Sequence, residues 1–379
     1  MNGIFYQSNK KREYEMKKKL FFECIILLLG AIIIFIVSTH DAFLYKQSIL
    51  QVTRVEQGKT FKSSDEYGNH DKKTDQTVYG ILLNSKKKGE KFKFQNTYTA
   101  SGGLSQKYQK GQQLFVTLNH DNGKFEVTPL NYKRDTYLFM MCWIMVCLLF
   151  MVMKIDGVRT IISVLINFVL FLIIVQLDVS WNITNFFIIF AVSAIIFTAI
   201  TLAIIVGINR QFVVTFAAIF SGTALALLIS VGVMWLTQDN GMHYEALDFA
   251  TQQPKQLFLS ATLIGLLGTV MDAATDIVST LFELKRSQPE VSFQQLYRSG
   301  REVGKDIMGP LINVLLLIFF AETFTMAVLY FRTKNTIGYT FSWTMSLGLL
   351  QAVISGIGIA LVIPAASLFA AWSLERSRA

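Results

Sequence analysis

Two aspartates inside a long apolar stretch are the residues best suited to chemistry. Asp272 and Asp276 are one helical turn apart within residues 259–283, a segment long and apolar enough to cross a bilayer. An ionised carboxylate costs roughly 2.5–3.5 kcal/mol at the centre of a spanning helix, so such a group faces protein, water or an ion. Two carboxylates this close repel, and one stays protonated near neutral pH unless a cation lies between them. The pattern indicates cation binding or a proton relay.

Neutral polar residues and small residues share the helical face of these aspartates. Thr269 and Ser279 recur at intervals of three and four with the acids, and we expect their hydroxyl groups to act as neutral ligands. Gly265 and Gly268 lie on the same stripe, where the missing side chains let a second helix approach closely. The opposite surface is rich in Leu, Ile, Val and Phe, which suits lipid or neighbouring helices.

The next apolar segment supplies a candidate facing wall. Asp306, Pro310 and Asn313 recur at helical spacing on one face, and Glu322 lies further along the same segment. A regular helix turns about 100° per residue, which places Glu322 roughly opposite Asn313. All four residues line one cavity only if Pro310 breaks or redirects the helix. The glycines of this segment are assigned to helix packing or hinge motion: Gly300, Gly304 and Gly309. We predict an ion-coupling or translocation site between the two segments.

A purely structural role for the acids is the alternative. In that case Lys and Arg side chains of the basic segment 285–305 neutralise them, and the ion pairs hold the helices together. Paired aspartates can also hydrolyse bonds when both approach one water, but here both lie on one helix and no second acid faces them. The sequence has no phosphate-binding Gly-Lys loop, nucleophile elbow or His-x-x-x-His pair. We expect no enzyme, no catalytic residue, no cofactor and no metal centre.

The composition defines the class of protein. The chain has 379 residues, of which 52% are hydrophobic and only 16% charged, and its mean hydropathy is +0.43. A soluble protein would have about a quarter charged residues. Besides an N-terminal anchor, we predict membrane spans at residues 137–153, 160–176, 183–206, 212–236, 257–283, 309–331 and 342–372. The fold class is an all-α polytopic membrane bundle of about eight transmembrane helices, with an inserted small extracytoplasmic β-rich domain.

Four segments follow from the polar and apolar pattern. They are a basic cytoplasmic N-terminus (1–19), a signal-anchor helix (20–40), an extracytoplasmic β-rich domain (41–134) and a seven-helix transmembrane domain (135–379). Short β-type runs fill the third segment, and Asn119 to Gly123 is typical of a hairpin turn. These strands could form a barrel. The run Lys86–Lys88 is interpreted either as a solvated loop tip or as a contact for anionic wall polymers or headgroups.

The placement of charge predicts the orientation. Basic residues gather at 10–19, at Lys154 and Arg159, at Arg210, at 285–305 and at the C-terminal end, whereas the alternate loops are poor in them. Under the positive-inside rule both termini are cytoplasmic. The net charge of +9 therefore marks topology and indicates no nucleic acid. In this orientation Asp272 is expected near the middle of the membrane and Asp276 nearer the cytoplasm.

The region GLLGTVMDAATDIVSTLFELKRSQPE…LYRSGREVGKDIMGPLINVLLL resembles the YibE/F family of bacterial multi-pass membrane proteins. The resemblance extends more loosely from about Lys133 to the C-terminus. It maps the family's signature onto Gly268, Met271, Asp272, Ser299, Gly300, Gly304, Asp306, Met308, Gly309 and Asn313. The anchor and β-domain are similar to those of the longer, YibE-type member, which implies a hetero-oligomer with a shorter, YibF-like membrane protein. Pro310 and Asp276 depart from the family pattern, so the resemblance favours Asp272 over Asp276.

Two functions remain open. The first is a permease or permease subunit that moves a small solute or ion, with the intramembrane carboxylates as the coupling site. The second is a membrane scaffold or accessory protein whose outer β-domain binds a partner or a cell-wall polymer. Beyond the lipid bilayer and the implied YibF-like protein, the sequence names no partner.

Overall fold

The chain forms two compact units, residues 1–157 (unit 1) and 158–379 (unit 2). The computed structural model describes residues 23, 25–85, 87–102, 105–121, 124–181, 185–246 and 253–375. Several features named above lie outside these residues: the basic cluster at 10–19, Lys86, Asn122 and Gly123 of the hairpin turn, and the basic C-terminal end. Each unit is described by itself.

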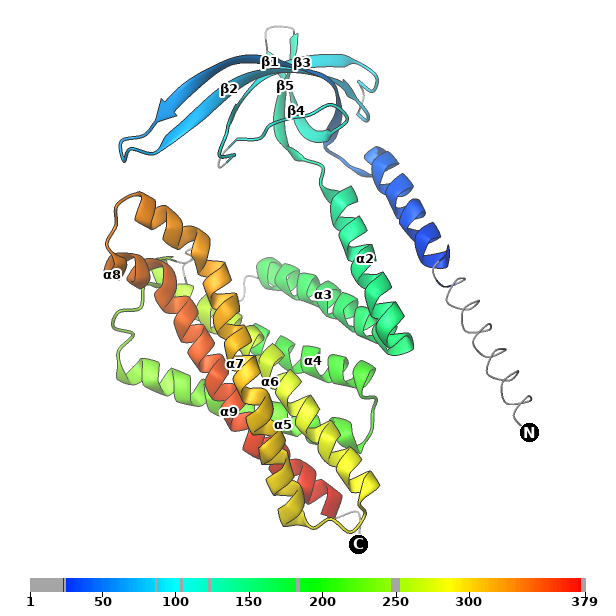
Figure 1. Cartoon of the computed structure of the whole chain (residues 1–379), viewed down its shortest axis with the longest axis vertical. Helices are drawn as coiled ribbons and strands as arrows, with labels where there is room; N and C mark the ends of the chain where they lie inside the picture. The colour runs from blue at the N-terminus through cyan, green and yellow to red at the C-terminus, as the bar shows by residue number, and fades with distance from the viewer. Residues whose placement is uncertain are drawn as a thin grey trace, which may run out of the picture. The chain divides into compact units, whose positions relative to one another are not determined.

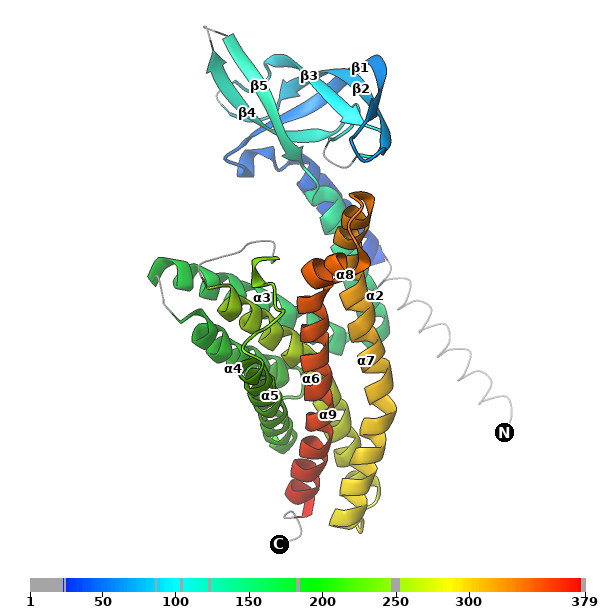
Figure 2. The same ribbon diagram turned by 90° about the vertical axis from the view of Figure 1, so that its left-hand side faces the viewer.

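Unit 1 contains a five-stranded antiparallel sheet in the order β3-β2-β1-β4-β5. The strands are β1 (Ser48–Ser64), β2 (His70–Leu82), β3 (Lys91–Thr99), β4 (Gln113–Asp121) and β5 (Lys124–Tyr132). The edge strands β3 and β5 lie beside each other without forming a ladder, so the sheet curls into a partly open Greek-key barrel (Figure 2). The predicted strands are present and β4 pairs with β5, but Asn119, His120 and Asp121 of the predicted turn belong to strand β4.

Alternating side chains build the interior of this barrel. In β2, Val78, Gly80 and Leu82 point inward while the residues between them are less buried. A side chain at Gly80 would meet Leu50 at 2.1 Å, so glycine permits β1 and β2 to approach here. The core is completed by residues from every strand: Leu50, Val52, Phe94, Leu114, Val116 and Val127.

A buried charge cluster joins the barrel to two apolar helices, Ile25–His40 and α2 (Asp135–Met153). The Lys133 side chain is only 1% exposed, and its Nζ lies 2.7 Å from Asp41 Oδ1 and 2.7 Å from Asp135 Oδ2. Lys133 also donates to the Ser38 carbonyl, and Tyr45 donates to Asp135 at 2.7 Å. The backbone thus passes from helix to strand and back again around one buried lysine.

Unit 2 is a helical bundle organised around α9. Its helices are α3 (Ile155–Trp181, which begins at the end of unit 1), α4 (Phe186–Ile205), α5 (Arg210–Leu236), α6 (Pro254–Ser287), α7 (Phe293–Arg332), α8 (Ile337–Thr340) and α9 (Ser346–Glu375), with the short turns η2 (Tyr244–Ala246) and η3 (Phe341–Met345). Helix α9 packs against α5, α6 and α7, and α6 also packs against α4 and α5 (Figure 1). The core of unit 2 is therefore formed mainly by α5, α6 and α9.

Helices α6 and α7 are longer than a bilayer requires. They have 34 and 40 residues, or about 51 and 60 Å at 1.5 Å per residue, against a hydrocarbon core of about 30 Å. Ser292 starts α7 with a capping box to Gln295. Contrary to a break at Pro310, α7 continues through this residue as one helix.

The predicted fold class is confirmed. Seven helices among the described residues are long and apolar enough to span a membrane, and the shorter apolar helix Ile25–His40 precedes them. The five-stranded sheet lies between that helix and α2.

Candidate functional site

Asp272 and Asp276 both lie on the exposed side of α6, away from the contact with α9. Their neighbours Ala273, Ala274 and Ile277 are fully buried. No Lys or Arg among the described residues pairs with either carboxylate. Ion pairs of this unit join other residues, among them Lys255 with Asp239, Arg286 with Glu283, and Arg298 with Glu302. The structure therefore gives no support, within the described residues, to the alternative in which basic side chains neutralise the two aspartates.

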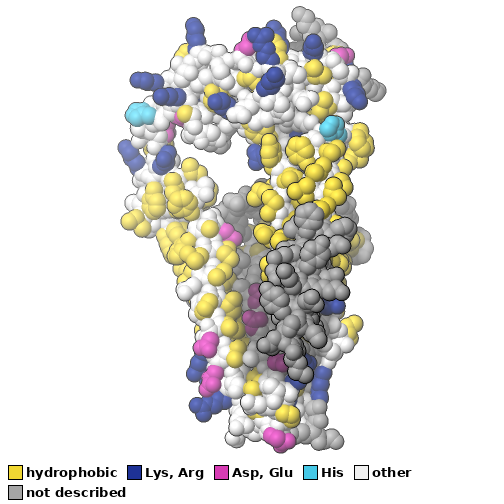
Figure 3. Space-filling model, turned by 45° about the vertical axis from the view of Figure 1, so that its right-hand side comes forward, with side chains coloured by type: hydrophobic (Ala, Val, Ile, Leu, Met, Phe, Trp, Pro, Cys, Tyr) yellow, Lys and Arg dark blue, Asp and Glu magenta, His cyan; other side chains and the backbone are white. Residues whose placement is uncertain are grey.

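Acidic side chains are visible partway down the membrane helices, among hydrophobic ones (Figure 3). The hydroxyls of Thr269 and Ser279 donate to carbonyls of their own helix, those of Leu266 and Asp276. They are not hydrogen-bonded to either carboxylate, although their lone pairs stay available to a cation.

The two glycines of the α6 stripe have different surroundings. A Cβ at Gly265 would lie 3.0 Å from Gln351 Nε2 on α9, so the absence of a side chain lets this amide approach α6. Gly268 has no neighbouring atom within 4 Å of its Cβ position, and it is exposed together with Asp272. The stripe is thus covered by α9 near Gly265 and open from Gly268 onward.

The predicted residues of α7 separate into two groups. Asp306, Gly309, Pro310 and Asn313 are exposed, and nothing lies within 4 Å of the Cβ position of Gly309. Glu322 lies on another side of the continuous helix and lines a cavity in which none of these four residues takes part. The structure does not bring the four polar candidates of α7 together.

Gly300 and Gly304 bring α7 against α9. A Cβ at Gly300 would lie 2.6 Å from Ser367 Oγ, and one at Gly304 would lie 2.3 Å from Ile363 Cγ2. Both glycines are buried. Four-residue spacing of small residues is typical of helices in close contact within membranes.

The contacts between α6 and α7 also show how far along the helix axes Asp272 and Asp276 lie. Gly300 faces Leu281, and α6 and α7 run in opposite directions, so Asp276 is about 8 Å from that contact and level with Lys305. Asp272 is one turn further and lies level with Gly309, just beyond the charged residues of α7.

Glu322 belongs to a cavity of about 400 Å³ near the other end of the bundle. Glu322 lies about 20 Å along α7 from the level of Asp272. The cavity wall consists of residues from η2, α6, α7, η3 and α9: Ala246, Leu257, Phe258, Ala261, Glu322, Thr323, Met326, Tyr330, Trp343, Thr344, Leu347, Gly348 and Gln351. Gln351 is the amide that also approaches Gly265, so one side chain connects the cavity with the α6 stripe.

An aromatic row supports this cavity. Trp343 stacks on His243 with ring centroids 4.4 Å apart, and Tyr339 lies between Trp343 and Tyr330 at 5.8 and 6.1 Å. Trp343 belongs to a single π-helical turn, Phe341–Met345, a deviation that is frequent at functional sites. Sequence reasoning missed both Trp343 and Gln351. The available signal was an amide isolated in an apolar run, Gln351, three residues after Gly348.

The loop before α6 is tied to the same end of the bundle. Asp239 pairs with Lys255 at 2.5 Å and accepts a hydrogen bond from Tyr244, whose ring meets Phe258 edge-on at 5.7 Å. Burial and the Asp239 charge raise the pKa of Tyr244, so its phenol stays a donor at neutral pH.

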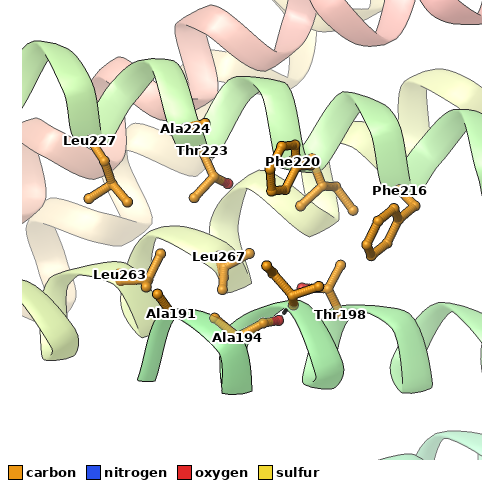
Figure 4. Close-up of a pocket in the computed structure, with 12 residues that line it drawn as sticks. Ala191, Ala194, Thr198, Phe216, Phe220, Thr223, Ala224, Leu227, Leu263 and Leu267 are labelled. Atoms are coloured by element: carbon orange, nitrogen blue, oxygen red, sulfur yellow. Dashed lines mark hydrogen bonds between the residues drawn. The ribbon is translucent and has the colours of Figure 1, made fainter. Parts of the chain in front are cut away.

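A second cavity, of about 120 Å³, lies between α4, α5 and α6 and is almost wholly apolar (Figure 4). Leu227, Phe220 and Leu267 are among its walls, and Thr198 bonds back to its own helix. The Thr223 hydroxyl is buried with no hydrogen-bond partner. Because the walls carry no charge, this cavity does not suit an ion.

Fold and site define a polytopic membrane protein. Its spanning helices carry carboxylates without partners among the described residues, and its small β-barrel lies in the sequence between the apolar helix Ile25–His40 and α2. The YibE/F-like protein family matches residues 141–376, and the YibE/F family N-terminal domain matches residues 43–132. The chain belongs to the YibE/F family, and its two matched regions are consistent with the longer, YibE-type member. No curated protein and no solved structure matches the chain. Within the described residues, no group of three or more His, Cys, Asp or Glu side chains could hold a metal ion.

Proposed function

We propose that this protein is a permease or permease subunit that moves a small solute or ion, with intramembrane carboxylates as its coupling site. The observation that carries the proposal is that Asp272 on α6 and Glu322 on α7, at different heights in the bundle, have no ion-pair partner in the described part of the chain. A carboxylate without a partner is costly in a membrane unless it meets water, a proton or a cation. Binding without catalysis is proposed.

The positions of Asp272 and Glu322 at different heights in the bundle suit alternating access of a solute or ion to a path along α6. The cavity with Glu322 serves one end, and the open stripe with Asp272 and Asp276 serves the other. Gln351 lies between the two levels, against Gly265. Asp306 and Asn313 extend the polar surface of α7 at the level of the aspartates, and Thr269 and Ser279 offer neutral oxygens beside them.

A flux measurement tests the coupling role. Purified protein is reconstituted in proteoliposomes, and proton and cation flux is compared between wild type, Asp272→Asn and Glu302→Gln. Glu302 is an exposed acid paired with Arg298, so its neutral variant is the matched control. We expect Asp272→Asn to lose flux while it inserts and accumulates normally. Equal flux from both variants would remove Asp272 from the mechanism, and loss of folded Asp272→Asn protein would favour a structural role.

The proposed orientation has both termini in the cytoplasm of a bacterial cell and the β-domain outside. Lys154, Arg210 and the basic segment 285–305 support it, because they fall in alternate connections between the helices along the sequence. Labelling single cysteines with an impermeant maleimide tests it. In intact cells, a cysteine in place of Ser287 should not react with the maleimide, whereas a cysteine in place of Asn335 should be labelled.

A hetero-oligomer with a shorter, YibF-like membrane protein is part of the proposal. The exposed acids of α6 and α7 and the open Gly268 leave a polar face that a second helix could cover. Co-expression of both proteins should shift the chain to a larger complex on a native gel. A shift that persists when Gly268 is replaced by Phe would place the contact elsewhere.

A scaffold or accessory role is the second candidate. It is favoured by the exposed lysines of the β-domain, such as Lys72, Lys91 and Lys93, which could bind an anionic wall polymer or an acidic partner. In that case removing residues 45–130 abolishes the cellular phenotype and Asp272→Asn is harmless. The permease proposal expects the opposite sensitivity for Asp272→Asn.

A further inference from the structure

Among the described residues, the wall of the cavity around Glu322 has one carboxyl group and no basic side chain. None of the residues that form its wall is Lys or Arg, and no hydrogen bond or ion pair of the Glu322 carboxylate is present among the described residues. The Glu322 side chain is exposed and not buried, and a carboxylate without a partner in a membrane helix favours binding of a positive group. A ligand of this cavity should therefore carry a positive charge.

The rest of the wall argues against a bare metal ion. Ca²⁺ takes about six to eight oxygen ligands, and Mg²⁺ demands an octahedral set. Here the hydroxyls of Thr323 and Thr344 donate to the Phe319 and Thr340 carbonyls, at 2.9 and 2.7 Å. Most of the remaining wall is apolar or aromatic: Leu257, Phe258, Met326, Tyr330, Trp343 and Leu347. One carboxylate in a mixed wall suits a cation that has its own apolar body.

Two further observations indicate that the cavity is a preorganised binding site. The Gln351 side chain has no hydrogen-bond partner among the described residues and can donate or accept. Trp343 is held in place by its stack on His243 and lies in the π-helical turn. Aromatic rings near a carboxylate are the recurrent environment of ammonium groups in proteins. The space of about 400 Å³ accommodates a molecule of a few carbon atoms.

We propose that this cavity binds a small organic cation, with its ammonium group at Glu322 and its alkyl part against Trp343 and Leu347. Gln351 recognises a second polar group of the ligand where one exists. That this ligand is the transported substrate rests on the proposed permease function, whereas the binding itself does not.

Equilibrium binding of radiolabelled butylammonium to the full-length protein in nanodiscs tests the proposal. Butylammonium should bind saturably, and unlabelled butanol, butyrate and KCl should compete at least about tenfold less well than butylammonium itself. Glu322→Gln should weaken binding at least about tenfold, and Glu322→Asp should weaken it less. Glu302→Gln, far from the cavity, should bind as wild type does. Size-exclusion profiles establish that each variant is folded.

The outcomes separate this inference from the proposed function. Saturable binding that depends on Glu322, without any flux in proteoliposomes, supports the cavity assignment and contradicts the permease. Flux that depends on Asp272, without saturable butylammonium binding, contradicts the cavity assignment alone. Equal competition by KCl would overturn the organic cation in favour of an inorganic one. Equal binding by folded wild type and Glu322→Gln would overturn the role of Glu322.

Discussion

Replacing Lys133 by Met should release the β-domain from its two helices. Lys133 is the cation that lies 2.7 Å from both Asp41 and Asp135, and its side chain is 1% exposed. Removing one partner of a buried ion pair costs roughly 3–5 kcal/mol, because the remaining charge is left uncompensated. At about 1.4 kcal/mol per tenfold change, local opening of the junction should become roughly 10²–10⁴ times more frequent.

Hydrogen exchange of the protein in nanodiscs measures this opening directly. Peptides that cover residues 41–50 and 131–136 should exchange faster in Lys133→Met, while peptides of β2 and β3 should keep their protection. Lys93→Met is the matched control, because Lys93 is exposed on β3. Its exchange should equal that of wild type.

A combined variant distinguishes charge from packing. Lys133→Met with Asp41→Asn and Asp135→Asn removes the orphaned charges, and protection of the junction should recover substantially. The reasoning would be refuted if Lys133→Met exchanged no faster than Lys93→Met. Failure of the triple variant to recover would show that the packing of the lysine stem, and not its charge, holds the junction.

Three further changes have defined outcomes. Gly304→Ala should destabilise the packing of α7 against α9 by about 1–3 kcal/mol in thermal unfolding, since the new Cβ would lie 2.3 Å from Ile363. Gly309→Ala should be neutral or stabilising by up to about 1 kcal/mol in the same assay. Equal effects of the two substitutions would contradict the close contact at Gly304. The pKa of Tyr45 is raised above its ordinary value, first by burial and second by the neighbouring carboxylates. The contribution of Tyr45 to protein stability is therefore complete below about pH 10 and is lost as the pH rises further. Tyr45→Phe should remove part of the alkaline destabilisation, and an unchanged dependence of stability on pH would exclude this role. Ser292→Ala should cost about 1 kcal/mol by removing the α7 cap, and an unchanged melting temperature would show that the cap is dispensable.

The contrast between Asp272 and Glu322 shows which features of the candidate site could be predicted from the sequence. Both were identifiable as acids in apolar helices, because such residues are rare and costly there. Their surroundings were not identifiable. Helical periodicity gives the face of a residue on its own helix, but the neighbour of that face depends on which helices pack together. The packing of α9 against α6 and α7 put Gln351 and Trp343 beside Glu322 and left Asp272 on an open face.

Pro310 gave a prediction that depended on local rules alone. A proline removes one backbone donor and favours a kink, so a break was the route to a common cavity for Asp306, Asn313 and Glu322. In the structure α7 continues, with its preceding turn held against α9 at Gly300 and Gly304. Beyond the proline, Phe319 of α7 lies against Gly348 of α9, so contacts on both sides accompany the continuous helix.

The sequence by itself determined the membrane class, the succession of long apolar helices, the β-rich insertion and the family, since these depend on hydropathy, alternation and local motifs. Only the tertiary structure decided the partly open barrel, the buried Lys133 junction and the cavity at Glu322. Each of these joins residues far apart in the chain, as when Lys133 meets Asp41. Such contacts follow from the packing of whole elements, which no local pattern encodes.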